Sequence, residues 1–349
     1  MDKWAVTLSG GHDSRAIAFL LQKCKTYQSP LKTITWGAES SLADAQSDAY
    51  VSEKVSEVLK TEHRFFSTEL PEVPLENIIS RFIQNGEGRI DHIPAYLDGF
   101  KLWKRIFEAG IEGIIRGDEI FGYNQIYSPL VVKSFMGLTL CSDYSNLKKY
   151  DYINSLKQEM PEILKQQRNE SLPTWRDRIF QLYRIPYIQS SLADIKYPYI
   201  EQINPFLSKR IVEVIRTMPD SLRTNKRLFK KVMKQWALGV PFAQRASTLK
   251  FTDILRQEDF VELIKKELSS DYAKKIFPET FLNEVIKNIK KGKQNESQQK
   301  RGAVDRLKGL IPLKIKTYLA QQKSSLHLDE NKLAFRIFII CRMHKELSS

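Results

Sequence analysis

The sequence has few cysteines, no long apolar run and neither of two common glycine-rich nucleotide motifs. Cys24, Cys141 and Cys341 are far apart and form no C-x-x-C pair, so neither a zinc site nor a disulfide framework is predicted, and a reducing cytoplasm is expected. No apolar run reaches the roughly 18 residues that span a bilayer, and no signal-peptide pattern is present, so no membrane association is expected. Neither G-x-x-x-x-G-K-S/T nor G-x-G-x-x-G occurs, which argues against γ-phosphate transfer on a P-loop.

The charge balance is strongly basic. The 349 residues carry 55 lysines and arginines against 41 acidic residues, for a net charge of +14. Such a balance suits nucleic acid, an anionic membrane surface or a polyanionic substrate. The lysines of residues 287–293 and the pair Lys300-Arg301 equally suit a solvated helix face. Charge alone therefore leaves the partner open.

The most informative segment is L-S-G-G-H-D-S-R at residues 8–15, between a strand-like stretch (4–8) and a helix-like one (16–21). A glycine pair lets the backbone turn tightly and approach a ligand closely. The free amides of the first helical turn then favour an anion, and Asp13 can hold a metal ion against phosphate oxygens. The pattern predicts a phosphate-binding turn; the alternative is an ordinary strand–helix turn with a polar cap.

The first 127 residues alternate strand and helix signals. Strands are predicted at 4–8, 31–37, 63–66 and 113–115, and helices at 16–21, 44–59, 75–84 and 96–109. This alternation predicts an α/β fold with a doubly wound parallel sheet, whose ligands lie at the carboxyl ends of the strands. Asp13 and the pair Asp118-Glu119 both follow strands at that edge, so we expect them in one site.

Strand signals stop at about Ser128. Helices are predicted at 144–157, 161–167, 175–183, 207–217, 226–238, 260–268 and 330–347, with a polar loop at 290–302. The predicted organisation is a nucleotide-binding α/β core at 1–127 and a mainly helical part at 128–349.

Two motifs resemble a known family. The S-G-G-x-D-S run resembles the pyrophosphate (PP) loop of ATP pyrophosphatases, which cleave ATP between its α and β phosphates. The run R-G-D-E-I-F-G-Y at 116–123 resembles a signature of the asparagine synthetase family, and the segments 204–208, 225–228 and 240–245 follow that family's order. The resemblance covers residues 4 to about 255. It implies the adenine-nucleotide α-hydrolase-like (PP-loop) fold, with ATP and Mg²⁺ as cofactors.

The resemblance also implies roles for particular residues. Asp13 and Asp118 would hold magnesium, and Lys226, Asp118 and Glu119 would serve catalysis. Lys226 is otherwise an exposed lysine at a helix start, and Glu119 a second metal-shell ligand or a helix cap. The residues implied to bind ATP are Leu8, Ser9, Gly10, Gly11, Asp13, Ser14, Trp36, Gly117 and Arg245.

The chain also departs from the family pattern. Ile115 stands where a glutamate is usual, and Ser208 and Ser247 replace an aspartate and a lysine. Asp2, not a nucleophilic cysteine, follows Met1, so the chain resembles a divergent member lacking the glutaminase domain. The predicted activity is an AMP- and pyrophosphate-forming amide ligase. It would activate a small-molecule or peptide carboxylate for attack by ammonia or an amine, with a separate glutaminase subunit as one nitrogen source. The alternatives are a catalytically impaired nucleotide-binding subunit and a tRNA-modifying enzyme with the same loop.

Overall fold

The computed structural model describes residues 2–24, 29–68, 73–93, 101–117, 125–236, 238–248, 251–292 and 326–348. The chain forms two compact units. The first, here called the sheet unit, comprises Met1–Gly86, His92–Asn124 and Ser190–Lys250; the helical unit comprises Glu87–Asp91, Gln125–Gln189 and Phe251–Ser349. None of the described helices is both long and apolar enough to cross a membrane.

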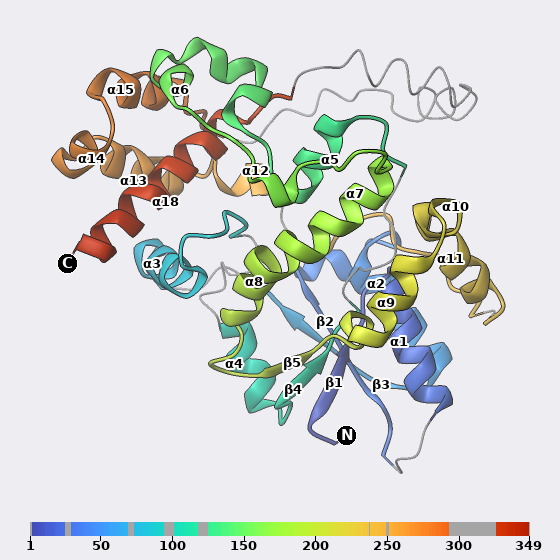
Figure 1. Ribbon diagram of the computed structural model, residues 1–349. Coiled ribbons are helices and arrows are strands. Elements are labelled where there is room, and N and C mark those ends of the chain that lie inside the picture. The colour runs from blue at the N-terminus through green and yellow to red at the C-terminus, as the bar shows by residue number, and fades with distance from the viewer. Residues whose placement is uncertain are drawn as a thin grey trace. The chain divides into compact units, whose positions relative to one another are not determined.

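The sheet unit contains a five-stranded parallel sheet in the order β3-β2-β1-β4-β5 (Figure 1). The strands are β1 (Trp4–Thr7), β2 (Lys32–Gly37), β3 (Glu62–Ser67), β4 (Gly113–Ile115) and β5 (Glu201–Ile203). The parallel sheet and its first four strands confirm the prediction. The expectation that no strand follows Ser128 is wrong, because β5 pairs with β4 at the sheet edge. Its three residues are exposed or half-buried and show no apolar run, so the strand depends on its partner and not on local sequence.

Eight helices of the sheet unit are described. They are α1 (His12–Lys23), α2 (Asp48–Leu59), α3 (Leu75–Gly86), α4 (Lys101–Glu108), α8 (Ser190–Asp194), α9 (Lys209–Thr217), α10 (Asp220–Arg223) and α11 (Arg227–Lys234), with short 3₁₀ turns η1 (Glu39–Leu42), η7 (Pro205–Leu207) and η8 (Thr224–Lys226). Adjacent residues of β2 show that helices cover both faces. The Thr35 hydroxyl donates to Ser52 of α2 over 2.8 Å, whereas Trp36 meets Trp103 of α4 edge to face. Since neighbouring strand residues point to opposite faces, the sheet is doubly wound, as predicted.

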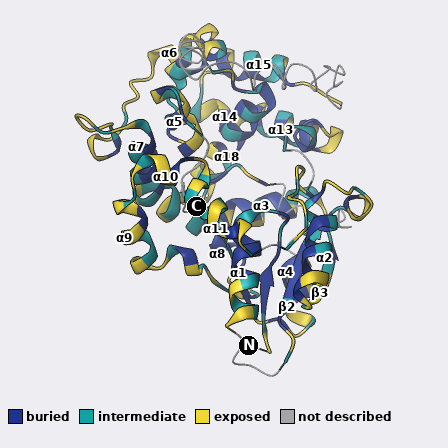
Figure 2. Cartoon of the chain, turned by 90° about the vertical axis from the view of Figure 1, so that its right-hand side faces the viewer, coloured by how far each residue is buried: buried dark blue, intermediate teal, exposed yellow. Residues whose placement is uncertain are grey.

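The core on the α1 and α2 side joins segments far apart in the sequence. Val6 and Ile115 from the strands pack with Val55 of α2 and with Phe206 and Met233 from the later part of the chain. Figure 2 shows the inner strand β2 largely buried and the edge strand β3 partly exposed. These contacts group residues 190–250 with the sheet, so the compact units differ from the division expected at residue 127. It remains a prediction that residues 1–127 alone form the nucleotide-binding core.

The helical unit is described by itself. Its helices are α5 (Pro129–Met136), α6 (Asp151–Ser155), α7 (Leu172–Ile179), the π-helix η6 (Phe180–Gln189), α12 (Phe251–Ile254), α13 (Glu258–Leu268), α14 (Asp271–Ile276), α15 (Glu279–Asn288) and α18 (Glu330–Ser348), with 3₁₀ turns η3 (Cys141–Asp143), η4 (Ser145–Lys149) and η5 (Glu162–Leu164). Helix α18 contacts α13, α14 and α15 and is buried as predicted through Phe335 and Phe338. The predicted helices at 144–157 and 161–167 are shorter turns. Most of the predicted loop at 290–302 and the start of the helix at 96–109 lie outside the described residues.

Candidate functional site

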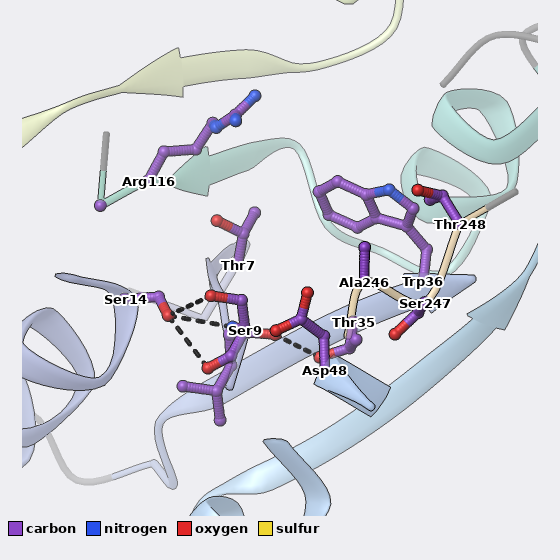
Figure 3. A pocket seen from close by; sticks show the side chains of 12 residues that line it. Thr7, Ser9, Ser14, Thr35, Trp36, Asp48, Arg116, Ala246, Ser247 and Thr248 are labelled. Carbon is purple, nitrogen blue, oxygen red and sulfur yellow. Dashed lines mark hydrogen bonds between the residues drawn. The ribbon is translucent and has the colours of Figure 1, made fainter. Parts of the chain in front are cut away.

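The loop between β1 and α1 is organised by its two serines. The Ser9 amide donates to Ser14 Oγ over 3.0 Å, and the two hydroxyl oxygens lie 2.9 Å apart (Figure 3). The Gly11 amide donates to Ser9 Oγ over 3.3 Å. Helix α1 begins at His12, and its N-cap residue Gly11 offers no side-chain cap. The loop therefore presents two hydroxyls beside an uncapped helix start, which is the arrangement that binds anions.

Three glycines around the loop have no room for a side chain. A Cβ at Gly10 would lie 2.2 Å from the Cβ of Ala243, and one at Gly37 would lie 2.3 Å from the Cβ of Ser247. A Cβ at Gly117 would lie 2.6 Å from the carbonyl carbon of Asp13. The glycines thus allow the loop, the end of β2, the second residue after β4 and the segment 243–248 to meet at van der Waals distance.

A cavity of about 190 Å³ opens where these segments meet. Its lining comes from the carboxyl ends of β1, β2 and β4, from the start of α2 and from the segment 246–248. Figure 3 shows Trp36, Asp48 and Ser9 around it. The lining residues are Thr7, Leu8, Ser9, Ser14, Thr35, Trp36, Asp48, Arg116, Gly117, Ala246, Ser247 and Thr248. The structure therefore brings Leu8, Ser9, Ser14, Trp36 and Gly117 together from the expected ATP-binding set.

Lys226 reaches the loop from another part of the chain. Its Nζ lies 2.5 Å from Asp13 Oδ2, and the two side chains are 12% and 11% exposed. Asn225 and Lys226 both have left-handed backbone angles, with φ of 58° and 52°, a conformation that costs non-glycine residues roughly 1–2 kcal/mol each. Such strain is typical of functional positions. Lys226 is thus not a freely solvated lysine but the half-buried partner of the loop aspartate.

His12 and Arg15 lie on the outer side of the loop. The His12 ring stacks on Phe242 at 3.8 Å, and the Arg15 guanidinium lies 4.2 Å from the centre of the same ring. Burial lowers the pKa of the His12 imidazole to about 4, assisted by the charges of Lys230, Lys226 and Arg15. Burial also lowers the pKa of Arg15 to about 10.

Asp48 is a cavity residue that the sequence analysis missed. Its Oδ1 accepts the Gly10 amide over 2.9 Å, and burial raises its pKa, although that hydrogen bond opposes the rise. The available signal was its position in the first turn of the helix after the second strand. Arg116 was missed as well; it directly follows β4 at the same edge and lines the cavity.

Arg245 is not among the cavity residues. Its side chain is 66% exposed, and its Nη1 pairs with Asp44 Oδ2 over 3.1 Å. The backbone beside it has a structural function, because the Arg245 carbonyl accepts the Asp48 amide over 2.9 Å. Ser247 stands where the family pattern has a lysine, and its side chain is uncharged. Its Oγ accepts the Ala49 amide over 2.8 Å, which holds the start of α2 in place.

The remaining expected site residues are placed as follows. Asp118 and Glu119 lie outside the described residues; the chain reaches the loop at Gly117, the residue before them. Ile115 is buried in the core of the sheet. Within the described ranges, no cluster of three or more histidine, cysteine or acidic side chains suits a metal ion.

The comparisons with known proteins agree with the fold and the loop. A family model described as asparagine synthase matches residues 3–190, more than half of the chain. No curated protein matches the chain significantly. The matched segment includes the loop and Gly117 and ends before Lys226 and Arg245.

Proposed function

Because the chain belongs to the asparagine synthase family, we propose that it is an ATP-dependent amide ligase that activates a carboxylate as an acyl-adenylate and releases pyrophosphate and AMP. The observation that carries this proposal is the meeting of the serine–glycine loop, Gly117 and Lys226 at the carboxyl edge of one parallel sheet. Three segments distant in sequence thus place hydroxyls, amides and the Lys226 ammonium at one loop. Such convergence suits a triphosphate and its developing charge.

In the first half-reaction, a carboxylate oxygen of the substrate attacks the α-phosphorus of ATP. The bond from that phosphorus to the oxygen bridging to the β-phosphate breaks, and pyrophosphate leaves. Ser9, Ser14 and the amides of Gly11 and the first turn of α1 would hold the departing pyrophosphate, exchanging their internal hydrogen bonds for bonds to phosphate oxygens. Trp36 would contact the adenine ring, and Asp48 would keep the loop in place through Gly10.

Magnesium, when bound, would neutralise phosphate charge, and Asp13 with Asp118 would supply the carboxylate oxygens that it prefers. Asp13 fits this role because its carboxylate already faces a cation, the Lys226 ammonium. With Asp13 holding magnesium, the Lys226 ammonium would be available to a phosphate oxygen. Glu119 would be an outer ligand or a helix cap.

In the second half-reaction, ammonia or an amine attacks the acyl carbon, AMP leaves and an amide forms. The Lys226 ammonium would stabilise the negative charge that develops at the attacked centre. Ile115 is buried in the core and places no carboxylate at the cavity, so aspartate is not the substrate we propose. The substrate is a small-molecule or peptide carboxylate, and the nitrogen comes from ammonia, an amine or a separate glutaminase subunit.

The test is product analysis. The 349-residue chain is incubated with ATP, magnesium, ammonia and a panel of carboxylates, and nucleotides are separated by chromatography. We expect AMP and pyrophosphate with at least one carboxylate. Lys226→Ala should lower the rate by about 10²–10³-fold, the usual effect of removing one charge-stabilising group. ADP as the main product would contradict the proposal.

A matched control lies on α11, the helix that follows Lys226. Lys231 is an exposed residue of α11, so Lys231→Ala removes the same charge without touching the loop and should retain the full rate. Melting curves of both variants show whether each is folded. Stabilisation by Mg-ATP without AMP formation from any carboxylate would instead support the catalytically impaired subunit.

A further inference from the structure

A second cavity lies in the sheet unit, between α1, α11 and the segment 238–242. Its volume is about 390 Å³, within the range of roughly 300–1,000 Å³ typical of small-molecule sites. It shares no lining residue with the cavity at the serine–glycine loop. The lining residues are His12, Arg15, Lys230, Met233, Lys234, Leu238, Gly239, Val240, Pro241 and Phe242.

The cavity is lined by positive charge without a negative one. Arg15 is 2% exposed, and within the described part of the chain its guanidinium donates to three backbone carbonyls, over 2.6 Å to Val240, 2.8 Å to Pro241 and 3.5 Å to Gly10. Among the described residues, neither Arg15 nor Lys230 nor Lys234 forms an ion pair with a carboxylate. A buried cation without a counter-ion is costly. An anion in this cavity would supply the missing charge.

The surrounding segment is also strongly basic. Residues 205–236 contain nine lysines and arginines against two acidic residues, which gives +7 of the chain's net +14. This concentration would attract anions toward the cavity before they bind.

The rest of the lining is apolar. Phe242 is 40% exposed even though it stacks on His12 and lies against Arg15. Met233, Leu238 and Val240 extend this apolar wall. An inorganic ion alone would leave that surface in contact with water, whereas an apolar group on the anion would cover it and gain about 25 cal/mol for each Å² buried.

We propose that this cavity is a second ligand site, which binds an oxyanion carried on an aromatic or aliphatic body. Lys230 and Lys234 contact the oxyanion, Arg15 contributes its buried charge, and Phe242 packs against the body. The shared chemistry is that of a phosphate ester or of a carboxylate. The site is separate from the proposed ATP cavity, so it can be tested without ATP and without any assumption about the reaction.

The experiment is isothermal titration calorimetry on the full chain, without nucleotide or magnesium. The probes are phenyl phosphate and benzoate. Inorganic phosphate serves as the control that lacks the apolar body, and phenol as the control that lacks the negative charge. We expect phenyl phosphate or benzoate to bind at least tenfold more tightly than inorganic phosphate and phenol; the tighter of the two identifies the oxyanion. Lys230→Gln with Lys234→Gln should weaken binding at least tenfold, since a hydrogen bond to a charged group typically accounts for that factor.

Arg227→Gln with Lys231→Gln is the matched control. Both residues are exposed on the same helix and line neither cavity, so this pair removes the same charge and should leave the affinity within a factor of two. Phe242→Ala should weaken phenyl phosphate and leave inorganic phosphate unchanged. Three results would overturn the proposal. They are an affinity for inorganic phosphate equal to that for phenyl phosphate and benzoate, an equal loss of affinity in the Lys230/Lys234 pair and in the Arg227/Lys231 pair, and a loss of affinity in Ser14→Ala alone. The last result would place the ligand in the loop.

Discussion

The contact between Gly10 and Ala243 gives a sharp test of how the site is assembled. In Gly10→Ala the new Cβ would lie 2.2 Å from the Cβ of Ala243 and 3.1 Å from its Cα and backbone nitrogen. Two of these three atoms are backbone, so no rotamer change relieves the overlap. Overpacking of this kind costs about 1–3 kcal/mol, and we expect the upper half of that range. Thermal melts should show a fall of about 2–4 °C for each kcal/mol.

Two comparisons make this prediction specific. Gly11→Ala adds the same atom one residue later, where the backbone is extended and the nearest contact is Ser9 Oγ at 3.3 Å, so it should cost within about 1 kcal/mol. Adding Ala243→Gly to Gly10→Ala removes the 2.2 Å overlap and should recover part of the loss, with a coupling of about 0.5–3 kcal/mol. If Gly10→Ala melts like the parent chain, or Ala243→Gly recovers nothing, segment 243–248 does not pack on the loop as described.

Three further predictions follow from other groups. Mg-ATP should raise the melting temperature by mass action, and Asp13→Asn should abolish that rise; a variant that still responds would move the nucleotide elsewhere. Burial lowers the pKa of the His63 imidazole from 6.5 to about 4. Because the folded state holds the neutral ring, its stability is highest above pH 6.5 and decreases as the pH falls toward 4. The free energy of unfolding should then fall by up to about 3 kcal/mol between pH 6.5 and 4. Urea titrations should show less of this fall in His63→Gln, and an unchanged profile would contradict the assignment. Ammonia rather than glutamine should support turnover. Burial raises the pKa of the Cys341 thiol to about 12 and also raises the pKa of the Cys141 thiol, so neither cysteine favours the nucleophilic thiolate that glutamine hydrolysis would need. Glutamine-dependent turnover by this chain would refute the prediction.

The sequence by itself determined the first four strands of the sheet and the position of the loop. Strands 4–7, 32–37 and 113–115 are short, mainly apolar or β-branched runs between helical segments, whereas strand 62–67 carries only Phe65-Phe66 as a local apolar signal. The phosphate-binding turn with its glycine pair and Asp13 could be predicted for the same reason, because a strand–turn–helix with free amides is a local feature of the sequence. The edge rule for parallel sheets predicts that Asp118 and Glu119 lie near Asp13. These two residues lie outside the described ranges, and Gly117, the residue before them, lies against the backbone of Asp13.

Only the tertiary structure decided what surrounds the loop. Lys226 is 213 residues from Asp13 along the chain. It approaches Asp13 through the left-handed backbone angles of Asn225 and Lys226, which the local sequence does not predict. Strand β5 exists because β4 offers unpaired backbone groups, not because its own residues favour a strand. Asp48 and Ser247 became cavity residues through long-range hydrogen bonds. Local sequence fixes backbone preferences and chemistry, whereas contacts between distant segments depend on which faces the whole chain buries.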